Sequence, residues 1–81
     1  MKRTDVSERL LSFIRERFLQ DDPASRLDAG TPLLDWGIVN SMNIAELLAF
    51  IHREFDHEVP PDAVVARNFR TVNDIATMIT G

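Results

Sequence analysis

The sequence predicts an all-α fold, a small four-helix bundle of three main helices and one short helix, with a long loop between helices one and two. Three stretches repeat apolar residues every three or four positions, which is the spacing of a single buried helix face. No stretch sustains the alternation of apolar and polar residues that indicates a strand. With 81 residues, the chain is expected to form one domain, residues 1–81, around one modest core.

The first helix is expected over residues 5–19. Asp5, followed three positions later by Glu8, is typical of a capping box, in which two side chains satisfy the first free N–H groups. The apolar face would consist of Val6, Leu10, Phe13, Ile14 and Phe18. The segment before Pro23 should end the helix, because proline restricts the residue before it to extended geometry.

A long connection is expected over residues 21–40, which two prolines and two glycines interrupt. A loop of this length in so small a domain is more often functional than idle. Five large apolar side chains should hold it against the helices: Leu27, Leu33, Leu34, Trp36 and Ile38. Trp36 is expected to be a mostly buried anchor, since large aromatic residues usually bury most of their surface.

The second helix should begin at Asn40 or Ser41 and end near Phe55. Its buried stripe would consist of Ile44, Leu47, Leu48, Ile51 and Phe55. Four residues off that stripe should be solvated: Asn43, Glu46, Arg53 and Glu54. After the helix, a short helical turn is expected over residues 62–66.

The last helix is expected over residues 71–79. Thr71 and Asp74 form the capping-box pattern, and Phe69 should pack just ahead of the cap. Its inward-facing residues would be Val72, Ile75, Ala76 and Ile79, with Met78 partly inward.

The net charge of −4 is unevenly distributed. Residues 1–20 hold five basic and three acidic residues, a balance of +2, whereas residues 21–81 hold four and ten, a balance of −6. An acidic surface disfavours nucleic acids and suits a protein partner with a basic patch. No apolar run approaches the ~20 residues that cross a bilayer, and the N-terminus lacks a signal-peptide core. We therefore expect a cytoplasmic monomer that binds neither nucleic acid nor membrane.

The residue types give little support to an enzyme or a metal protein. The chain has no cysteine, which excludes disulfides, thiolate nucleophiles and cysteine-based metal sites. His52 and His57 are five positions apart, whereas a helical zinc pair needs a spacing of four. No G-x-S-x-G elbow is present for a serine nucleophile, and no carboxylate pair indicates acid–base chemistry. A small catalytic domain is therefore the least favoured class.

Ser41, at the expected start of the second helix, admits two interpretations. Serine is a favoured helix cap, because its side-chain oxygen accepts a backbone N–H that the helix leaves unpaired. Alternatively, Asn40 supplies the cap, and the Ser41 hydroxyl points outward between the apolar neighbours Val39 and Met42. A phosphate attached there would gain about 0.3–1 kcal/mol from the helix N-terminus.

The segment GIVNSMNIAELLAFIHREF, residues 37–55, resembles the prosthetic-group site of acyl carrier proteins, a [DN]-S-[LM] motif that opens a long second helix. The resemblance covers nearly the whole chain, with D-x-G before the site, HEVPPD after the helix and FRTVNDIATMI as the closing helix. It implies that a phosphopantetheinyl transferase, using coenzyme A and Mg²⁺, joins 4′-phosphopantetheine to Ser41 through a phosphodiester. The thiol of that arm would carry acyl or aminoacyl groups as thioesters.

The same resemblance implies a partner-facing surface on the second helix, formed by Met42, Ala45, Glu46, Ala49 and Arg53. The implied partners are the transferase, an adenylating enzyme that loads the arm, and a downstream acyltransferase, ketosynthase or condensation enzyme. His52 and Arg53 stand where fatty-acid carriers are strongly acidic. This favours a discrete carrier of the polyketide, nonribosomal-peptide or aminoacyl-transfer type.

One departure from the family pattern leaves a second class of function open. Asn40 stands where the family usually has an aspartate, so a negative charge that could steer a transferase is missing. The alternative is a helical adaptor of the same fold that is never primed and only binds partner proteins.

Overall fold

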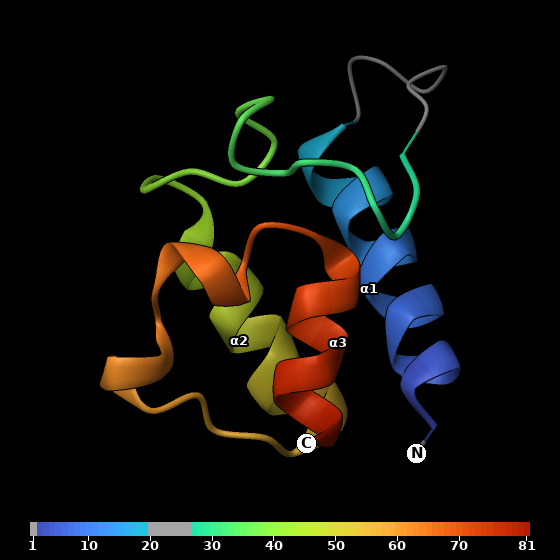
Figure 1. The fold of residues 1–81 in the computed structure, drawn as a ribbon, viewed down its shortest axis with the longest axis vertical. Coiled ribbons are helices and arrows are strands. Elements are labelled where there is room, and N and C mark those ends of the chain that lie inside the picture. Colours follow the sequence, from blue (N-terminus) through green and yellow to red (C-terminus); the bar gives the residue numbers. More distant parts are fainter. Residues whose placement is uncertain (1, 20–26) are drawn as a thin grey trace.

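The computed structural model describes residues 2–19 and 27–81, which form three α-helices and two 3₁₀ turns (Figure 1). Their bounds are α1 Arg3–Phe18, α2 Ile44–Phe55, η1 Pro61–Ala63, η2 Ala66–Asn68 and α3 Val72–Thr80. These described ranges contain no strand, so the predicted all-α class is confirmed. None of the helices within them is long and apolar enough to cross a bilayer.

The predicted fourth helix takes a different form. The expected turn over residues 62–66 is replaced by two separate 3₁₀ turns, η1 and η2, and extended backbone at Val65 (φ −131°, ψ 156°) lies between them. The extended residue interrupts the run of helical dihedral angles, so the segment cannot continue as one helix. The described bundle therefore consists of three α-helices.

α1 begins two residues before the predicted position, and its predicted capping box is wrong. Lys2 is the N-cap residue and makes no side-chain cap hydrogen bond, while Asp5 lies inside the first turn. There its carboxylate is close to the positive end of the helix dipole, which favours an acidic residue without a capping bond. α1 ends at Phe18, and the expected stop before Pro23 lies outside the described residues.

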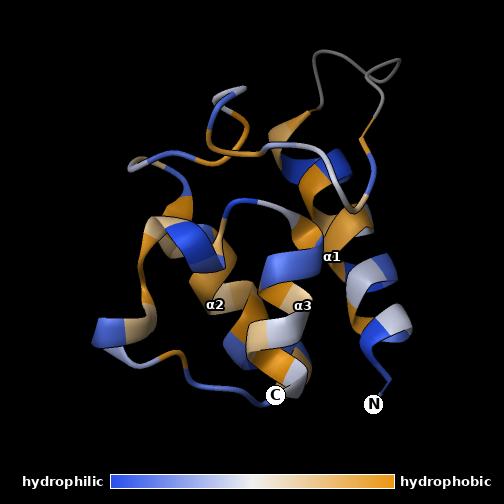
Figure 2. Ribbon diagram, in the orientation of Figure 1, coloured by the Kyte–Doolittle hydropathy of each residue, from blue (hydrophilic) through white to orange (hydrophobic). Residues whose placement is uncertain are grey.

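α1 packs along α3 and runs antiparallel to it, so the start of α1 and the end of α3 lie at the same end of the molecule (Figure 1). Apolar residues from all three helices and from the loop before α2 meet between them (Figure 2). The buried apolar core is Val6, Leu10, Ile14, Leu27, Leu33, Val39, Leu47, Phe50, Ile51, Phe69, Val72, Ile75 and Ala76. This set confirms six of the residues predicted to face inward on α1 and α3, whereas Phe13, Phe18 and Ile79 are only partly buried and pack against its edge.

Aromatic side chains join α1 to α2. The ring of Phe13 stacks on that of Phe50 with centroids 4.0 Å apart. Phe18 contacts Phe13 edge-on, and Phe55 contacts Phe50 in the same way. The predicted stripe of α2 omitted Phe50, which is buried because its ring fills the space over Phe13.

The loop before α2 is fixed to the start of α3 by backbone hydrogen bonds. The Leu33 N–H donates to the Arg70 carbonyl oxygen at 2.8 Å, and the Asn73 N–H donates to the Ala29 carbonyl oxygen at 3.0 Å. These bonds satisfy backbone groups that would otherwise be buried without partners. The loop therefore has a defined position, from which the chain enters α2.

The predicted burial of Trp36 is wrong, because its side chain is 61% exposed. Leu33 and Val39 occupy the inward positions of this part of the loop and are almost completely buried. A turn closes between them, with the Gly37 N–H donating to the Leu34 carbonyl oxygen at 3.1 Å and Gly37 at a φ of +73°. The turn places Trp36 on its outer side.

Candidate functional site

Ser41 lies in a turn that precedes α2, not inside the helix. α2 begins at Ile44, with Asn43 as its N-cap residue. The carbonyl oxygen of Asn40 accepts hydrogen bonds from the N–H groups of Asn43, at 3.2 Å, and Ile44, at 3.0 Å. The predicted start at Asn40 or Ser41 is therefore early by about one turn, and this turn leads directly into the helix.

The capping role that Ser41 could have taken is filled by Asn40. Its side-chain oxygen accepts hydrogen bonds from the backbone N–H of Met42 at 2.8 Å and of Asn43 at 3.2 Å. The Ser41 side chain is exposed, and its hydroxyl forms no hydrogen bond with any residue in the described ranges. The second of the two interpretations of Ser41 therefore fits the structure: the asparagine caps, and the hydroxyl is accessible.

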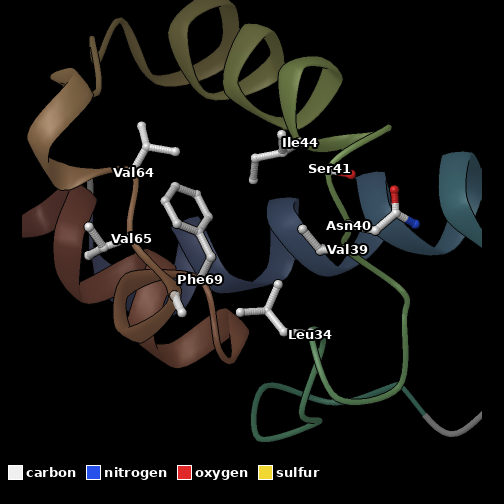
Figure 3. A pocket seen from close by; sticks show the side chains of 9 residues that line it. Leu34, Val39, Asn40, Ser41, Ile44, Val64, Val65 and Phe69 are labelled. Atoms are coloured by element: carbon white, nitrogen blue, oxygen red, sulfur yellow. The ribbon is translucent and has the colours of Figure 1, made fainter.

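A pocket of about 220 Å³ lies beside Ser41 (Figure 3). Its walls come from the loop, the start of α2 and the segment around η2: Leu34, Val39, Asn40, Ser41, Ile44, Val64, Val65, Ala66 and Phe69. Most of these side chains are aliphatic or aromatic, and a protein cavity of ~150 Å³ is already large enough for a benzene-sized apolar ligand. The pocket can therefore hold a small apolar group close to the serine. Sequence reasoning missed it, because its walls come from three separate segments.

The predicted partner face on α2 is largely exposed. Met42 is 92% exposed, which is unusual for so large an apolar side chain, and Ala45, Ala49 and Arg53 are also exposed. Glu46 is the exception, since it is only partly exposed.

Glu46 was expected to be a solvated carboxylate, but it is paired within the chain. Arg17 of α1 donates to the Glu46 carboxylate, and Arg9 of α1 donates to Glu54 at 2.5 Å. Both carboxylates of α2 are therefore partly neutralised by cations from α1. Arg53 forms no ion pair with the residues that the structure describes, so this face offers a partner an unpaired cation.

The structure places the remaining candidate side chains apart from Ser41. His52 is exposed on α2, and His57 is half-buried in the segment that follows the helix. Across residues 2–19 and 27–81, no three histidine, cysteine or acidic side chains gather as a group that could hold a metal ion.

Comparison with known proteins agrees with this geometry. Residues 8–79 match the family described as "Phosphopantetheine attachment site". Two proteins of Bradyrhizobium diazoefficiens are similar to the chain. Aminoacyl carrier protein 2 is 31% identical over 75 residues, covering 93% of this chain and 83% of the relative, and aminoacyl carrier protein 1 is 26% identical over 76 residues, covering 94% and 83%.

Among solved structures, a chain in a crystal structure of an FAD-dependent dehydrogenase matches with a TM-score of 0.79 and 32% identity, covering 85% of this chain and 96% of that one. The similarity therefore extends over most of the chain in sequence and in fold. On this basis the chain belongs to the acyl carrier protein family, whose members carry covalently attached 4′-phosphopantetheine and serve as carriers and not as enzymes.

Proposed function

We propose that Ser41 is the attachment point of 4′-phosphopantetheine, and that the protein shuttles thioester-bound intermediates between biosynthetic enzymes. The observation that carries this proposal is the exposed Ser41 hydroxyl, which the Asn40 cap leaves without a structural role. Ser41 also lies within the segment that matches the phosphopantetheine attachment family. The chain has no cysteine, so the thiol of a thioester has to come from the attached arm.

The chemistry at Ser41 is a phosphoryl transfer. A transferase moves the phosphopantetheinyl group from coenzyme A to the Ser41 oxygen, so that one phosphodiester bond forms and the bond to adenosine 3′,5′-bisphosphate breaks. The hydroxyl proton is taken up by the transferase or by solvent. α2 directs its N-terminal end toward the Ser41 turn, and the positive end of its dipole favours the new phosphate by about 0.3–1 kcal/mol.

The proposed cargo is a small aminoacyl or acyl group. Both curated relatives are named aminoacyl carrier proteins, and the pocket beside Ser41 is apolar and only about 220 Å³ in volume. A side chain of a few carbon atoms fits such a volume, whereas a long fatty chain would extend beyond it. The loading enzyme would then be an adenylating enzyme that forms the thioester.

The enzymes that meet the loaded carrier are proposed to contact the exposed part of α2 and the turn before it. The exposed side chains of Met42, Ala45 and Ala49 form an apolar surface along the turn and the first part of α2. Arg53 adds a cation further along the helix. A flavin dehydrogenase is one candidate for such an enzyme, since a chain of the same fold occurs in a crystal structure of an FAD-dependent dehydrogenase. Acyltransferases, ketosynthases and condensation enzymes are the other candidates.

Intact-mass spectrometry tests the proposal. The purified protein is incubated with coenzyme A, Mg²⁺ and a phosphopantetheinyl transferase of broad specificity, in parallel with Ser41→Ala. We expect the wild-type protein to gain the mass of one phosphopantetheine and Ser41→Ala to gain nothing. An unmodified wild-type protein would favour the alternative function, an adaptor that is never primed. A mass gain in Ser41→Ala would mean that another residue is the attachment point.

A further inference from the structure

Two asparagines flank Ser41, and the second of them links both sides of the Ser41 turn. The side-chain oxygen of Asn43 accepts a hydrogen bond from the Asn40 backbone N–H at 2.8 Å. Its side-chain nitrogen donates to the Ile38 carbonyl oxygen at 2.8 Å. The two bonds require opposite ends of the side chain, so only one orientation of this amide satisfies both.

The two ends of the Asn40 side chain make hydrogen bonds of unequal number and length. The oxygen of Asn40 accepts the two capping bonds, whereas its side-chain nitrogen donates only one long bond, of 3.3 Å, to the Gly37 carbonyl oxygen. An acceptor is therefore essential at position 40, and the donor adds little. A carboxylate could replace this amide, because accepting N–H bonds at a helix start is what a carboxylate does best.

Asn43 is different, because its donor and its acceptor make equally short bonds. A carboxylate at position 43 could accept the bond from the Asn40 N–H, but it would place a charged oxygen against the Ile38 carbonyl oxygen. Two acceptors in contact repel each other, and at this partly buried position the repulsion is only partly screened by water. Position 43 therefore needs an amide.

We propose that Asn43 is a positioning residue for the modification of Ser41: its amide holds residues 38–43 in the conformation that presents the Ser41 hydroxyl to a transferase. This inference rests on the proposed attachment of phosphopantetheine at Ser41. Ser41 forms no side-chain bond of its own with the described residues, so the hydroxyl is positioned only through the backbone on either side of it. Asn43 contacts that backbone on the side before the serine, at Ile38 and Asn40.

Two matched substitutions test the proposal, since Asn43→Asp and Asn40→Asp make the same chemical change three residues apart. Initial rates of phosphopantetheine transfer from coenzyme A are measured over a range of carrier concentrations. The temperature is one at which circular dichroism shows each variant to be folded. We expect Asn43→Asp to lower kcat by about tenfold or more with KM changed less than about twofold, because a misplaced nucleophile slows the transfer step. Asn40→Asp keeps an acceptor for both capping bonds, so its kcat should fall less than that of Asn43→Asp, and the added negative charge beside Ser41 should lower KM by steering the transferase.

Asn43→Ala serves as a second variant, which removes both side-chain bonds without adding a charge. It should lower kcat in the same direction as Asn43→Asp. The proposal is overturned if both folded position-43 variants are modified at the wild-type rate, if only KM changes, or if Asn40→Asp lowers kcat as much as Asn43→Asp. The wild-type reaction in the same experiment tests the proposed function separately. If the wild-type protein is never modified at Ser41, the proposed function itself is refuted.

The pH dependence of stability gives a measurement that needs no transferase. At position 43 only a protonated carboxyl can donate to Ile38, so folding should raise the pKa of the introduced group above its usual value of about 3.9. Asn43→Asp should then recover stability, relative to the wild-type protein, as pH falls through that raised pKa. At position 40 the charged form accepts the capping bonds, so folding should lower the pKa, and Asn40→Asp should lose relative stability as pH falls. Urea denaturation of the three proteins between about pH 3 and pH 7 measures both trends. Trends of the same sign would contradict the proposed role of the Asn43 amide.

Discussion

The start of α3 and the turn that leads into α2 are capped by different side chains, and the difference determines which hydroxyl is accessible. At α3, the Thr71 hydroxyl oxygen accepts a bond from the Asp74 N–H at 3.1 Å, and the hydroxyl donates to the Asp74 carboxylate at 3.0 Å. In the turn before α2, the corresponding bonds are made by the side-chain amides of Asn40 and Asn43. The Thr71 hydroxyl is thus fully engaged, whereas the Ser41 hydroxyl is not. Because Asn40 caps the turn before α2, esterification of the Ser41 hydroxyl breaks no capping bond, whereas esterification of Thr71 would break the bond to Asp74.

The largest stability difference between the two helix starts should come from the aromatic residues that precede them. Phe69, two residues before the α3 cap, is 2% exposed. Phe69→Ala should lower the free energy of unfolding by about 3–5 kcal/mol, because it leaves a cavity in the core. This approaches the total stability of about 5 kcal/mol expected for so small a domain. Urea denaturation measures the loss, and a value below about 1 kcal/mol would contradict the packing of the Phe69 side chain.

A smaller effect is expected at the α3 cap itself. Thr71→Ala removes the hydroxyl that accepts the Asp74 N–H, so stability should fall by about 1 kcal/mol. Because this hydroxyl lies at the start of another helix, the rate of phosphopantetheine transfer to the folded protein should not change. Thermal unfolding measures the loss of stability, and initial rates of phosphopantetheine transfer measure the modification of Ser41. A folded Thr71→Ala protein that is modified slowly would mean that the two helix starts are not independent.

The acidic residues in the first turns of the two helices differ in their partners. The Asp74 carboxylate accepts a hydrogen bond from the Thr71 hydroxyl at the cap of the same helix, whereas the Glu46 carboxylate forms an ion pair with Arg17 of α1. Glu46→Lys places two cations together on a partly exposed surface, and stability should fall by less than about 1 kcal/mol. Denaturation of Glu46→Lys with and without Arg17→Glu measures the coupling, since the double variant restores the pair in reverse. Equal stability of the single and double variants would mean that the ion pair contributes nothing.

The smallest effect is expected at Trp36, the aromatic residue in the loop before α2. Its side chain is 61% exposed, so Trp36→Ala should change stability by no more than about 0.5 kcal/mol. Trp36 is the single tryptophan of the chain, and its fluorescence should be that of a solvated indole in the native protein. A blue-shifted native emission, or a stability loss similar to that of Phe69→Ala, would show that the side chain is buried.

Regular apolar spacing made most of the fold predictable. The inward residues of α1 and α3 follow the helical repeat, and the Thr71–Asp74 pattern located the start of α3 correctly. At α1 the same pattern failed, because Asp5 and Glu8 lie within a helix that begins earlier, at Arg3. At α1 the apolar repeat also begins directly after Asp5, at Val6, so motif and repeat together did not locate the start of that helix.

The attachment serine could be identified from its motif, but its surroundings could not be predicted. Asn43 was expected to be an ordinary solvated residue, because nothing in the sequence shows that its amide reaches Ile38. The pairing of Glu46 with Arg17 joins residues 29 positions apart, and depends on how α1 and α2 pack. The pocket beside Ser41 likewise needs the η2 segment and the loop to be placed together.

The central claim, that the unused hydroxyl of Ser41 is the attachment point, is tested most directly by locating the modification in the peptide sequence. Trypsin cleaves after Arg26 and Arg53 and releases residues 27–53, in which Ser41 is the single serine. Fragmentation of this peptide, after reaction of the protein with coenzyme A and transferase, should place one phosphopantetheine on Ser41. The group found on any other residue, or a peptide that stays unmodified while the protein is folded and the transferase is active on a control carrier, would contradict it.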